Sequence, residues 1–274
     1  MPTPRPVVSR HHPFLKEFRA AFRTPPEESG KLAIEGPRLL GEALRSGWKI
    51  EKVLFSETGH AQHGPKLLTQ FSKHVAVAVV EDDLFRACAE VEQPQGVAAL
   101  LALQVPDLQE ICTAQRADGA PPLLVVAAGL QDPGNMGTLL RSADAFGATA
   151  FIALAGTVSP WNAKAVRASA GSGFHLPVLS RLAVADFLAA CRVHGVAILS
   201  SAARAKLELD AVDFRRPLCL VLGQEASGVP REILRASEAT VAIPMQREVE
   251  SLNAGVAGAI LLYEAARQRA RNDV

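Results

Sequence analysis

The fold is decided by the stretch Leu123-Leu124-Val125-Val126-Ala127-Ala128, which runs directly into Gly129-Leu130-Gln131-Asp132-Pro133-Gly134-Asn135. Six consecutive apolar residues are too few for most helices, and a run without a polar position is typical of a strand buried on both faces of a parallel sheet. Proline and glycine then force a turn, and Asn135 is expected to cap a helix that carries Arg141 about two turns later. This order of strand, turn and helix predicts an α/β fold.

The same unit recurs along the rest of the chain. Strands are expected at 151–154, 196–199, 218–222 and 240–243, and helices at 138–146, 163–170, 183–194, 231–236 and 252–269. Alternating strands and helices predict a parallel sheet with helices on both of its faces. The pattern places this domain at residues 122–274.

A smaller α/β domain is predicted at residues 30–105. Helices are expected there at 39–44, 66–72 and 83–89, and strands at 50–55, 75–80 and 97–103. Between the two domains the hydrophobic period fails, and several prolines predict a linker at 106–121. Residues 1–29 are interpreted as a basic N-terminal extension, because Arg, Lys and His side chains crowd its first two dozen positions.

The composition limits the class of protein. A chain of 274 residues with 49% hydrophobic and 21% charged residues is globular and long enough for about two domains. A net charge of +1 gives by itself no evidence for a nucleic-acid partner. No membrane span and no signal-peptide core is evident, so we expect a cytoplasmic protein. The spacing of the cysteines predicts reduced thiols and no metal site; they are Cys88, Cys112, Cys191 and Cys219.

Polar residues and glycines follow three of the expected strands. They lie in segments 135–141, 223–228 and 243–253, and the last includes Ser251, which is expected to cap the final helix. In open α/β sheets, ligands bind outside the carboxyl ends of the strands. Turn chemistry alone would explain each segment taken singly, so their shared position is the informative observation.

In this order the three segments resemble the signature motifs of the SpoU/TrmH branch of the SPOUT methyltransferases, which methylate ribose 2′-hydroxyls in RNA. The resemblance covers residues 30–268 and is strongest from residue 123 onward; Ile34-Glu35-Gly36 and Gln95-Gly96-Val97 resemble the family's substrate-binding domain more loosely. It implies a SPOUT domain with a trefoil α/β knot, a preceding RNA-binding domain and a homodimer. The implied activity is S-adenosylmethionine-dependent 2′-O-methylation, with ribosomal RNA favoured as the substrate.

The resemblance also implies roles for particular residues. The catalytic residues would be Asn135, Arg141, Glu225, Ser251 and Asn253. The cofactor would be held near Leu222, Gly223, Ile243, Met245 and Leu252. RNA contacts are assigned to Arg10, Lys16, Arg19 and Arg23 because basic residues crowd the N-terminus, and also to Arg38 and Arg167, although a solvated tail or helix face would explain such cations equally well. Gln224 and Arg247 depart from the residues that the family usually has.

Arg141 is better suited to positioning than to proton removal. Neutralising a guanidinium with a pKa of about 13.8 at pH 7 costs roughly 9 kcal/mol. Its planar fork can instead hold phosphate and hydroxyl groups and stabilise a developing alkoxide. We therefore expect Arg141 to act as a positioned cation.

Several other interpretations remain open. A tRNA 2′-O-methyltransferase would carry the same motifs, as would a non-catalytic RNA-binding relative, although the intact polar residues favour an enzyme. A nucleotide-binding Rossmann enzyme is weakened by the missing glycine fingerprint. A hydrolase is disfavoured because residues 170–173 do not form G-x-S-x-G and no H-E-x-x-H occurs. Binding of S-adenosylmethionine would separate these classes.

Overall fold

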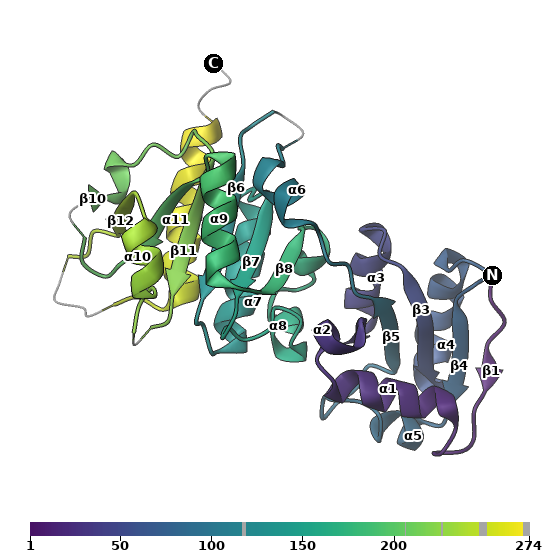
Figure 1. Ribbon diagram of the computed structural model, residues 1–274. Coiled ribbons are helices and arrows are strands. Elements are labelled where there is room, and N and C mark those ends of the chain that lie inside the picture. Colours follow the sequence, from purple (N-terminus) through teal and green to yellow (C-terminus); the bar gives the residue numbers. More distant parts are fainter. Residues whose placement is uncertain (117–118, 206, 226, 247–250, 271–274) are drawn as a thin grey trace. The chain divides into compact units, whose positions relative to one another are not determined.

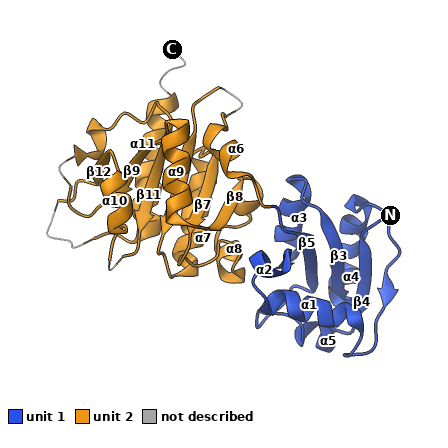
Figure 2. Ribbon diagram, viewed as in Figure 1, with its two compact units in different colours: residues 1–104 blue, residues 105–274 orange. Residues whose placement is uncertain are grey.

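The computed structural model describes residues 1–116, 119–205, 207–225, 227–246 and 251–270. The chain forms two compact units, unit 1 at residues 1–104 and unit 2 at residues 105–274 (Figures 1 and 2). Both units are α/β, which confirms the predicted fold class. Arg247, whose effect on the predicted pocket was an open question, lies outside the described residues.

Unit 2 is built on a parallel sheet in the strand order β10-β12-β9-β11-β6-β7-β8. Its strands are β6 (Leu123–Ala128), β7 (Ala150–Leu154), β8 (Val178–Leu182), β9 (Ala197–Ser201), β10 (Leu207–Glu208), β11 (Leu218–Gly223) and β12 (Ala239–Ala242). Every residue of β6 is buried, as expected of a strand covered on both faces. The sequence pattern did not reveal β8 and β10, which are respectively partly exposed and only two residues long.

Helices cover both faces of this sheet (Figure 1). They are α6 (Leu108–Thr113), α7 (Pro133–Ala145), α8 (Ala163–Ala168), α9 (Val184–His194), α10 (Arg231–Ala236) and α11 (Ala254–Ala270), with short 3-10 helices at Ser172–Phe174 and Leu209–Ala211. Helices α6, α9 and α10 share one apolar core with the alternate residues of β6, β7 and β11. The packing of α7 against α8 and α11 forms a second helical group.

The caps of α7 and α11 differ from those predicted. Asp132, not Asn135, caps α7, because Asp132 precedes the proline that opens the helix and accepts the N–H of Asn135 at 2.8 Å. Asn253, not Ser251, caps α11, and its Oδ1 accepts the N–H groups of Gly255 and Val256. Both asparagines are thereby fixed in place by helix starts.

Unit 1 contains a mixed sheet in the order β1-β4-β3-β5-β2. Its strands are β1 (Arg5–Pro6), β2 (Lys31–Glu35), β3 (Ile50–Ser56), β4 (Ala76–Val80) and β5 (Val97–Ala102). Strands β1, β3 and β4 are parallel, whereas β5 runs antiparallel to both β3 and β2. The helices are α1 (Pro13–Arg23), α2 (Pro26–Ser29), α3 (Pro37–Arg45), α4 (Glu57–Leu67) and α5 (Asp82–Arg86), with a 3-10 helix at Leu68–Gln70.

Two segments have more structure than the sequence pattern predicted. Residues 1–29 were interpreted as an extension, but β1 pairs with β4 and α1 buries Leu15 and Phe18 in the core of unit 1. Residues 106–121 were interpreted as a linker, but α6 packs on α9 and buries Ile111 and Cys112. In both segments the buried apolar residues are few and lie among charged residues or prolines, so the sequence pattern did not indicate a helix.

Candidate active site at the strand ends of unit 2

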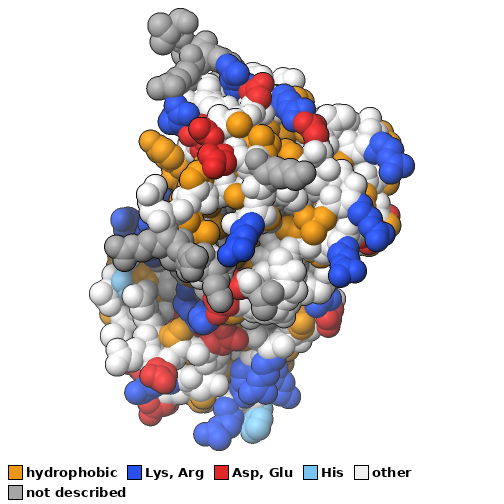
Figure 3. Space-filling model, turned by 90° about the vertical axis from the view of Figure 1, so that its left-hand side faces the viewer, with side chains coloured by type: hydrophobic (Ala, Val, Ile, Leu, Met, Phe, Trp, Pro, Cys, Tyr) orange, Lys and Arg blue, Asp and Glu red, His pale blue; other side chains and the backbone are white. Residues whose placement is uncertain are grey.

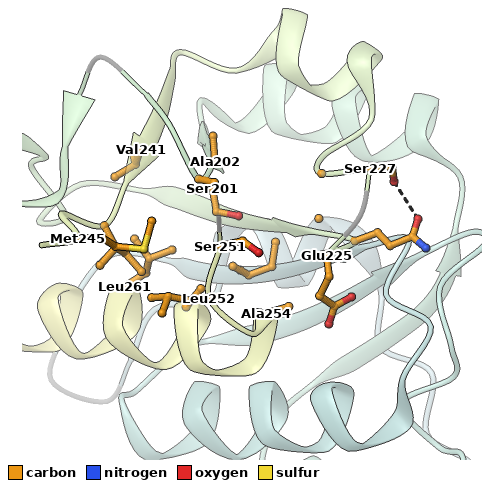
Figure 4. A pocket seen from close by; sticks show the side chains of 17 residues that line it. Ser201, Ala202, Glu225, Ser227, Val241, Met245, Ser251, Leu252, Ala254 and Leu261 are labelled. Carbon is orange, nitrogen blue, oxygen red and sulfur yellow. Dashed lines mark hydrogen bonds between the residues drawn. The ribbon is translucent and has the colours of Figure 1, made fainter. Parts of the chain in front are cut away.

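A pocket of about 480 Å³ opens at the carboxyl ends of β9, β11 and β12. The five residues predicted to hold the cofactor all line it: Leu222, Gly223, Ile243, Met245 and Leu252. In Figure 4 the apolar side chains of Met245, Leu252 and Leu261 lie toward one end of the pocket, and Glu225 lies toward the other. The pocket therefore has an apolar end and a polar end.

A chain of hydrogen bonds joins three of the predicted catalytic residues near the polar end. The Nδ2 of Asn253 donates to Oδ1 of Asn135 at 2.8 Å, and the Nδ2 of Asn135 donates to Oε1 of Glu225. The Oδ1 of Asn253 already accepts two N–H groups at the start of α11, so its amide can present only its NH₂ group to Asn135. The start of α11 thus determines which group donates in the Asn253–Asn135 and Asn135–Glu225 hydrogen bonds, and these bonds orient the carboxylate of Glu225.

The loop after β11 positions Glu225. Gln224 and Gly228 exchange two backbone hydrogen bonds of 3.2 and 2.8 Å, and the hydroxyl of Ser227 donates to Oε1 of Gln224 at 2.8 Å (Figure 4). A Cβ atom at Gly223 would collide with the backbone of Gly228 and Val229, so only glycine fits there. Gln224, which departs from the family's usual residues, contributes its side chain to closing this loop.

Arg141 and Ser251 occupy different positions relative to the hydrogen-bonded chain. Ser251 lines the pocket. Arg141 is exposed on α7, and within the described part of the chain it makes no hydrogen bond or ion pair. The structure therefore brings Asn135, Glu225 and Asn253 together and leaves Arg141 outside their network.

The start of α7 carries a stabilised negative charge. The backbone N–H of Asn135 donates to the carboxyl group of Asp132 and, with Lys164 nearby, lowers the pKa of that carboxyl below its ordinary value. The Nζ of Lys164 lies 3.7 Å from Oδ2 of Asp132. Asp132 is thus ionised at neutral pH, where it holds the helix turn that presents Asn135.

The cations predicted to contact RNA are mostly exposed. Arg10, Lys16, Arg23 and Arg38 in unit 1 and Arg167 in unit 2 have exposed side chains. Arg19 differs, because it is partly buried and donates to the backbone oxygen of Arg10. On the face drawn in Figure 3, Lys and Arg side chains gather in several groups, and Asp and Glu side chains also lie on that face.

The residues present fit a nucleoside cofactor. The volume lies within the range of about 300–1,000 Å³ typical of small-molecule sites, and the lining combines an apolar wall with backbone groups of Leu222 and Gly223. The sequence did not single out Ser201, Ala202 and Ala203, which also line the pocket. Their only sequence signal is that they follow the strand predicted at 196–199.

Neither a metal site nor a membrane-spanning helix is found in the described ranges. Among those residues, no group of three or more His, Cys, Asp or Glu side chains is arranged to hold a metal ion. No helix in the same ranges is both long and apolar enough to cross a membrane.

The sequence of this chain matches two family profiles. The SpoU rRNA Methylase family matches residues 122–263, and the MRM3-like substrate binding domain matches residues 23–99. Together the two profiles cover most of both units.

Named relatives match over most of their own length. The chain is 30% identical over 230 residues to the 23S rRNA (guanosine(2553)-2′-O)-methyltransferase RlmP of Bacillus subtilis, covering 84% of this chain and 86% of the relative. It is 28% identical over 275 residues to the 23S rRNA (uridine(2479)-2′-O)-methyltransferase of Streptomyces viridochromogenes, covering 98% and 94%.

Solved structures agree with these matches. The rRNA methyltransferase of Sinorhizobium meliloti with bound AdoMet superposes with a TM-score of 0.84 at 27% identity, covering 96% of this chain and 97% of that one. The SpoU methyltransferase AviRb of Streptomyces viridochromogenes in complex with AdoMet gives 0.82 at 27% identity, covering 95% and 99%.

Proposed function

The chain belongs to the SpoU rRNA methylase family, and we propose that it methylates a ribose 2′-hydroxyl of ribosomal RNA through the residues around the unit 2 pocket. It is an S-adenosylmethionine-dependent RNA 2′-O-ribose methyltransferase. The single observation that supports this site is the hydrogen-bonded chain from Asn253 through Asn135 to Glu225 beside the pocket. Ribosomal RNA is preferred to tRNA because the two relatives described above are named for 23S rRNA.

The pocket residues divide between holding the cofactor and orienting the ribose. S-adenosylmethionine carries its methyl group on a positively charged sulfur, which makes the methyl carbon electrophilic. Backbone groups at Leu222 and Gly223 would hold its polar parts, and Met245 and Leu252 would cover its adenine. This arrangement leaves the polar end of the pocket for the RNA.

Asn135, Glu225 and Asn253 would orient the target nucleotide at that polar end, with Ser251 beside them. The 2′-oxygen forms its bond to the methyl carbon while the carbon–sulfur bond breaks, and the hydroxyl proton leaves to solvent. Arg141 would stabilise the negative charge that develops on the 2′-oxygen and hold the neighbouring phosphate. No residue of the site has to be a strong base in this scheme.

We also propose that the protein works in the cytoplasm as a homodimer formed through α7 and α11. Val256 and Tyr263 of α11 are 46% and 57% exposed, and the ring of Tyr263 meets Phe146, which follows α7, edge to face at 5.8 Å. Exposed apolar side chains on α11, beside the end of α7, favour burial against a second copy. Arg141, exposed on α7, would then be supplied to the pocket of the partner.

Calorimetry and RNA mapping test the proposed function. Titration with S-adenosylmethionine and S-adenosylhomocysteine should show binding, and Gly223→Ala should abolish it. Mapping of 2′-O-methylation in ribosomal RNA and tRNA from cells with and without the protein should show one ribosomal position that depends on it. A missing tRNA modification with unchanged ribosomal RNA would overturn the proposed substrate.

A further inference from the structure

Unit 1 contains a second pocket that the methyl-transfer site does not use. It has a volume of about 530 Å³ and lies at the carboxyl ends of β3 and β4, beside the start of β5. This is the edge of an open sheet at which ligands commonly bind. The pocket belongs entirely to unit 1.

Hydrogen bonds between loops hold the floor of this pocket. The N–H of Ser56 donates to the backbone oxygen of Gly96 at 2.9 Å, and the hydroxyl of Ser56 accepts the N–H of Gly59 at 3.0 Å. The carboxylate of Asp82 accepts both the N–H and the hydroxyl of Thr58. A Cβ atom at Gly59 would lie 2.8 Å from the Cα of Gly96. The segments around these two glycines therefore pack with their backbones in direct contact, with no side chain between them.

The wall of the pocket presents polar side chains that are not engaged elsewhere. Gln62, His63, Glu92, Gln93 and Gln95 line it, and within the described ranges none of them donates or accepts a side-chain hydrogen bond. Each carboxamide offers two donors and an acceptor. Pro37 and Pro94 add flat apolar surface. The wall can therefore pair with a ligand that has both donors and acceptors on a planar ring.

The charges of the pocket favour a neutral ligand. Asp82 and Glu92 face the same cavity as Arg86 and His63, and the hydrogen bonds from Ser56 and Thr58 lower the pKa of Asp82, so it is ionised at neutral pH. Two carboxylates would repel a phosphate, whereas the ring edge of a base has donors and acceptors without charge. Single-stranded RNA is commonly recognised through such exposed base edges.

We propose that this pocket binds one unpaired nucleobase of the substrate RNA, so that unit 1 reads sequence or structure at a position apart from the methylated ribose. The identification of the ligand as RNA rests on the proposed function. The assignment of the pocket to a base rests on the neutral array of carboxamides around a rigid floor.

Kinetics of a double variant test the proposal. In Gln93→Ala/Gln95→Ala, the KM for unmethylated ribosomal RNA, taken from cells lacking the protein, should rise about tenfold or more, because two side chains that would hydrogen-bond to the base are lost. The kcat and the dissociation constant of S-adenosylmethionine should stay within about twofold, since unit 2 is unchanged. Gln70→Ala, an exposed glutamine of unit 1 outside the pocket, is the matched control and should leave all three constants unchanged.

An NMR titration separates this proposal from the proposed function. Adenosine, guanosine, cytidine and uridine are added separately to the full chain, with ribose 5-phosphate as the comparison. At least one nucleoside should shift the backbone amide signals of Glu92, Gln93, Gln95 and Gly96, and ribose 5-phosphate should not. Equal shifts with ribose 5-phosphate, or a KM in the double variant equal to that of the wild type, would overturn the base pocket while leaving the methyltransferase intact. A wild-type protein that methylates no RNA but shows the nucleoside shifts would overturn only the proposed function.

Discussion

Asn135 connects two loops that are 90 and 118 residues away in sequence, through its bonds to Glu225 and Asn253. In Asn135→Ala we expect kcat to fall roughly a hundredfold, the effect typical of removing one oriented polar group from an active site. The affinity for S-adenosylmethionine should change little, because Asn135 does not line the pocket.

The comparison that isolates this effect is Gln109→Ala, which removes an exposed carboxamide on α6. It should leave kcat unchanged. A kcat in Asn135→Ala close to that of the wild type would show that the hydrogen-bonded chain does not contribute to the reaction.

Arg141→Lys tests whether the guanidinium is a cation or a base. We expect kcat to fall at least tenfold at every pH, because lysine keeps the charge but loses the planar fork. Arg231→Lys, an exposed arginine on α10, is the matched control. Methylation by Arg141→Lys at a rate near that of the wild type would contradict the positioning role, and a gain in its rate at high pH would favour a base.

Sequence reasoning reached the pocket but not the local geometry of its residues. The five pocket-lining positions come from motif resemblance, and the structure places them around one cavity. The predicted helix caps were wrong because each helix start offers two good cap residues. These are Asp132 and Asn135 for α7, and Ser251 and Asn253 for α11, and only the residue at which the helix begins decides between them. Ser201 to Ala203 have no distinctive side chains, so nothing in the sequence marked them.

Gly137 allows the close approach of α7 to α8. A Cβ atom there would lie 2.5 Å from the Cβ of Ala168 and 2.6 Å from the backbone oxygen of Ala165. We expect Gly137→Ala to lower the free energy of unfolding of unit 2 by about 1–3 kcal/mol, the usual cost of overpacking. Chemical denaturation followed by circular dichroism measures it.

Gly41→Ala provides the opposite case, because this glycine lies inside α3 and a Cβ atom there meets nothing closer than 3.5 Å. It should stabilise unit 1 by about 0.5–1 kcal/mol through helix propensity. Stabilisation by both substitutions would contradict the tight packing of α7 on α8.

Three buried thiols lie where α6 and α9 pack on β11. Burial raises the pKa of Cys112 to about 11 and that of Cys219 well above its ordinary value. The folded state binds these protons more tightly than the unfolded state, so stability is full below the unfolded thiol pKa and falls as pH rises from about 8.5 toward 11.

Urea denaturation between pH 8 and 11 should therefore show a falling midpoint. The slope should be smaller in Cys112→Ala than in the wild type, because one of the shifted thiols is gone. An equal slope in the two proteins would contradict the contribution of Cys112.

The elements that sequence reasoning missed have a common physical cause. In α1 only Leu15, Phe18 and Ala21 are buried, and basic residues stand between them. Strand β2 was not predicted, because it has only five residues and is followed almost at once by α3, which begins at Pro37. The bounds of long strands buried on both faces, such as β6 and β11, were predicted to within one residue. An unbroken run of six or so apolar residues is typical of a buried strand and too short for most helices.

The proposed dimer predicts that two inactive variants complement each other. Arg141→Ala and Asn253→Ala should each be inactive alone. If Arg141 serves the partner's pocket, unfolding and refolding an equal mixture should restore about a quarter of wild-type activity, because half the dimers are mixed and each has one intact site. Gel filtration should show dimers throughout. No recovery from mixed dimers would place Arg141 in the site of its own chain.

The return of the chain from β12 to α11 also fixes when the protein becomes competent during its synthesis. The strands of the sheet emerge first, whereas Ser251, Leu252 and Asn253, with the α11 residues that close the pocket, are made after every other part of it. Domains fold as their residues emerge. A growing chain therefore has an open, incomplete pocket until α11 docks on α7.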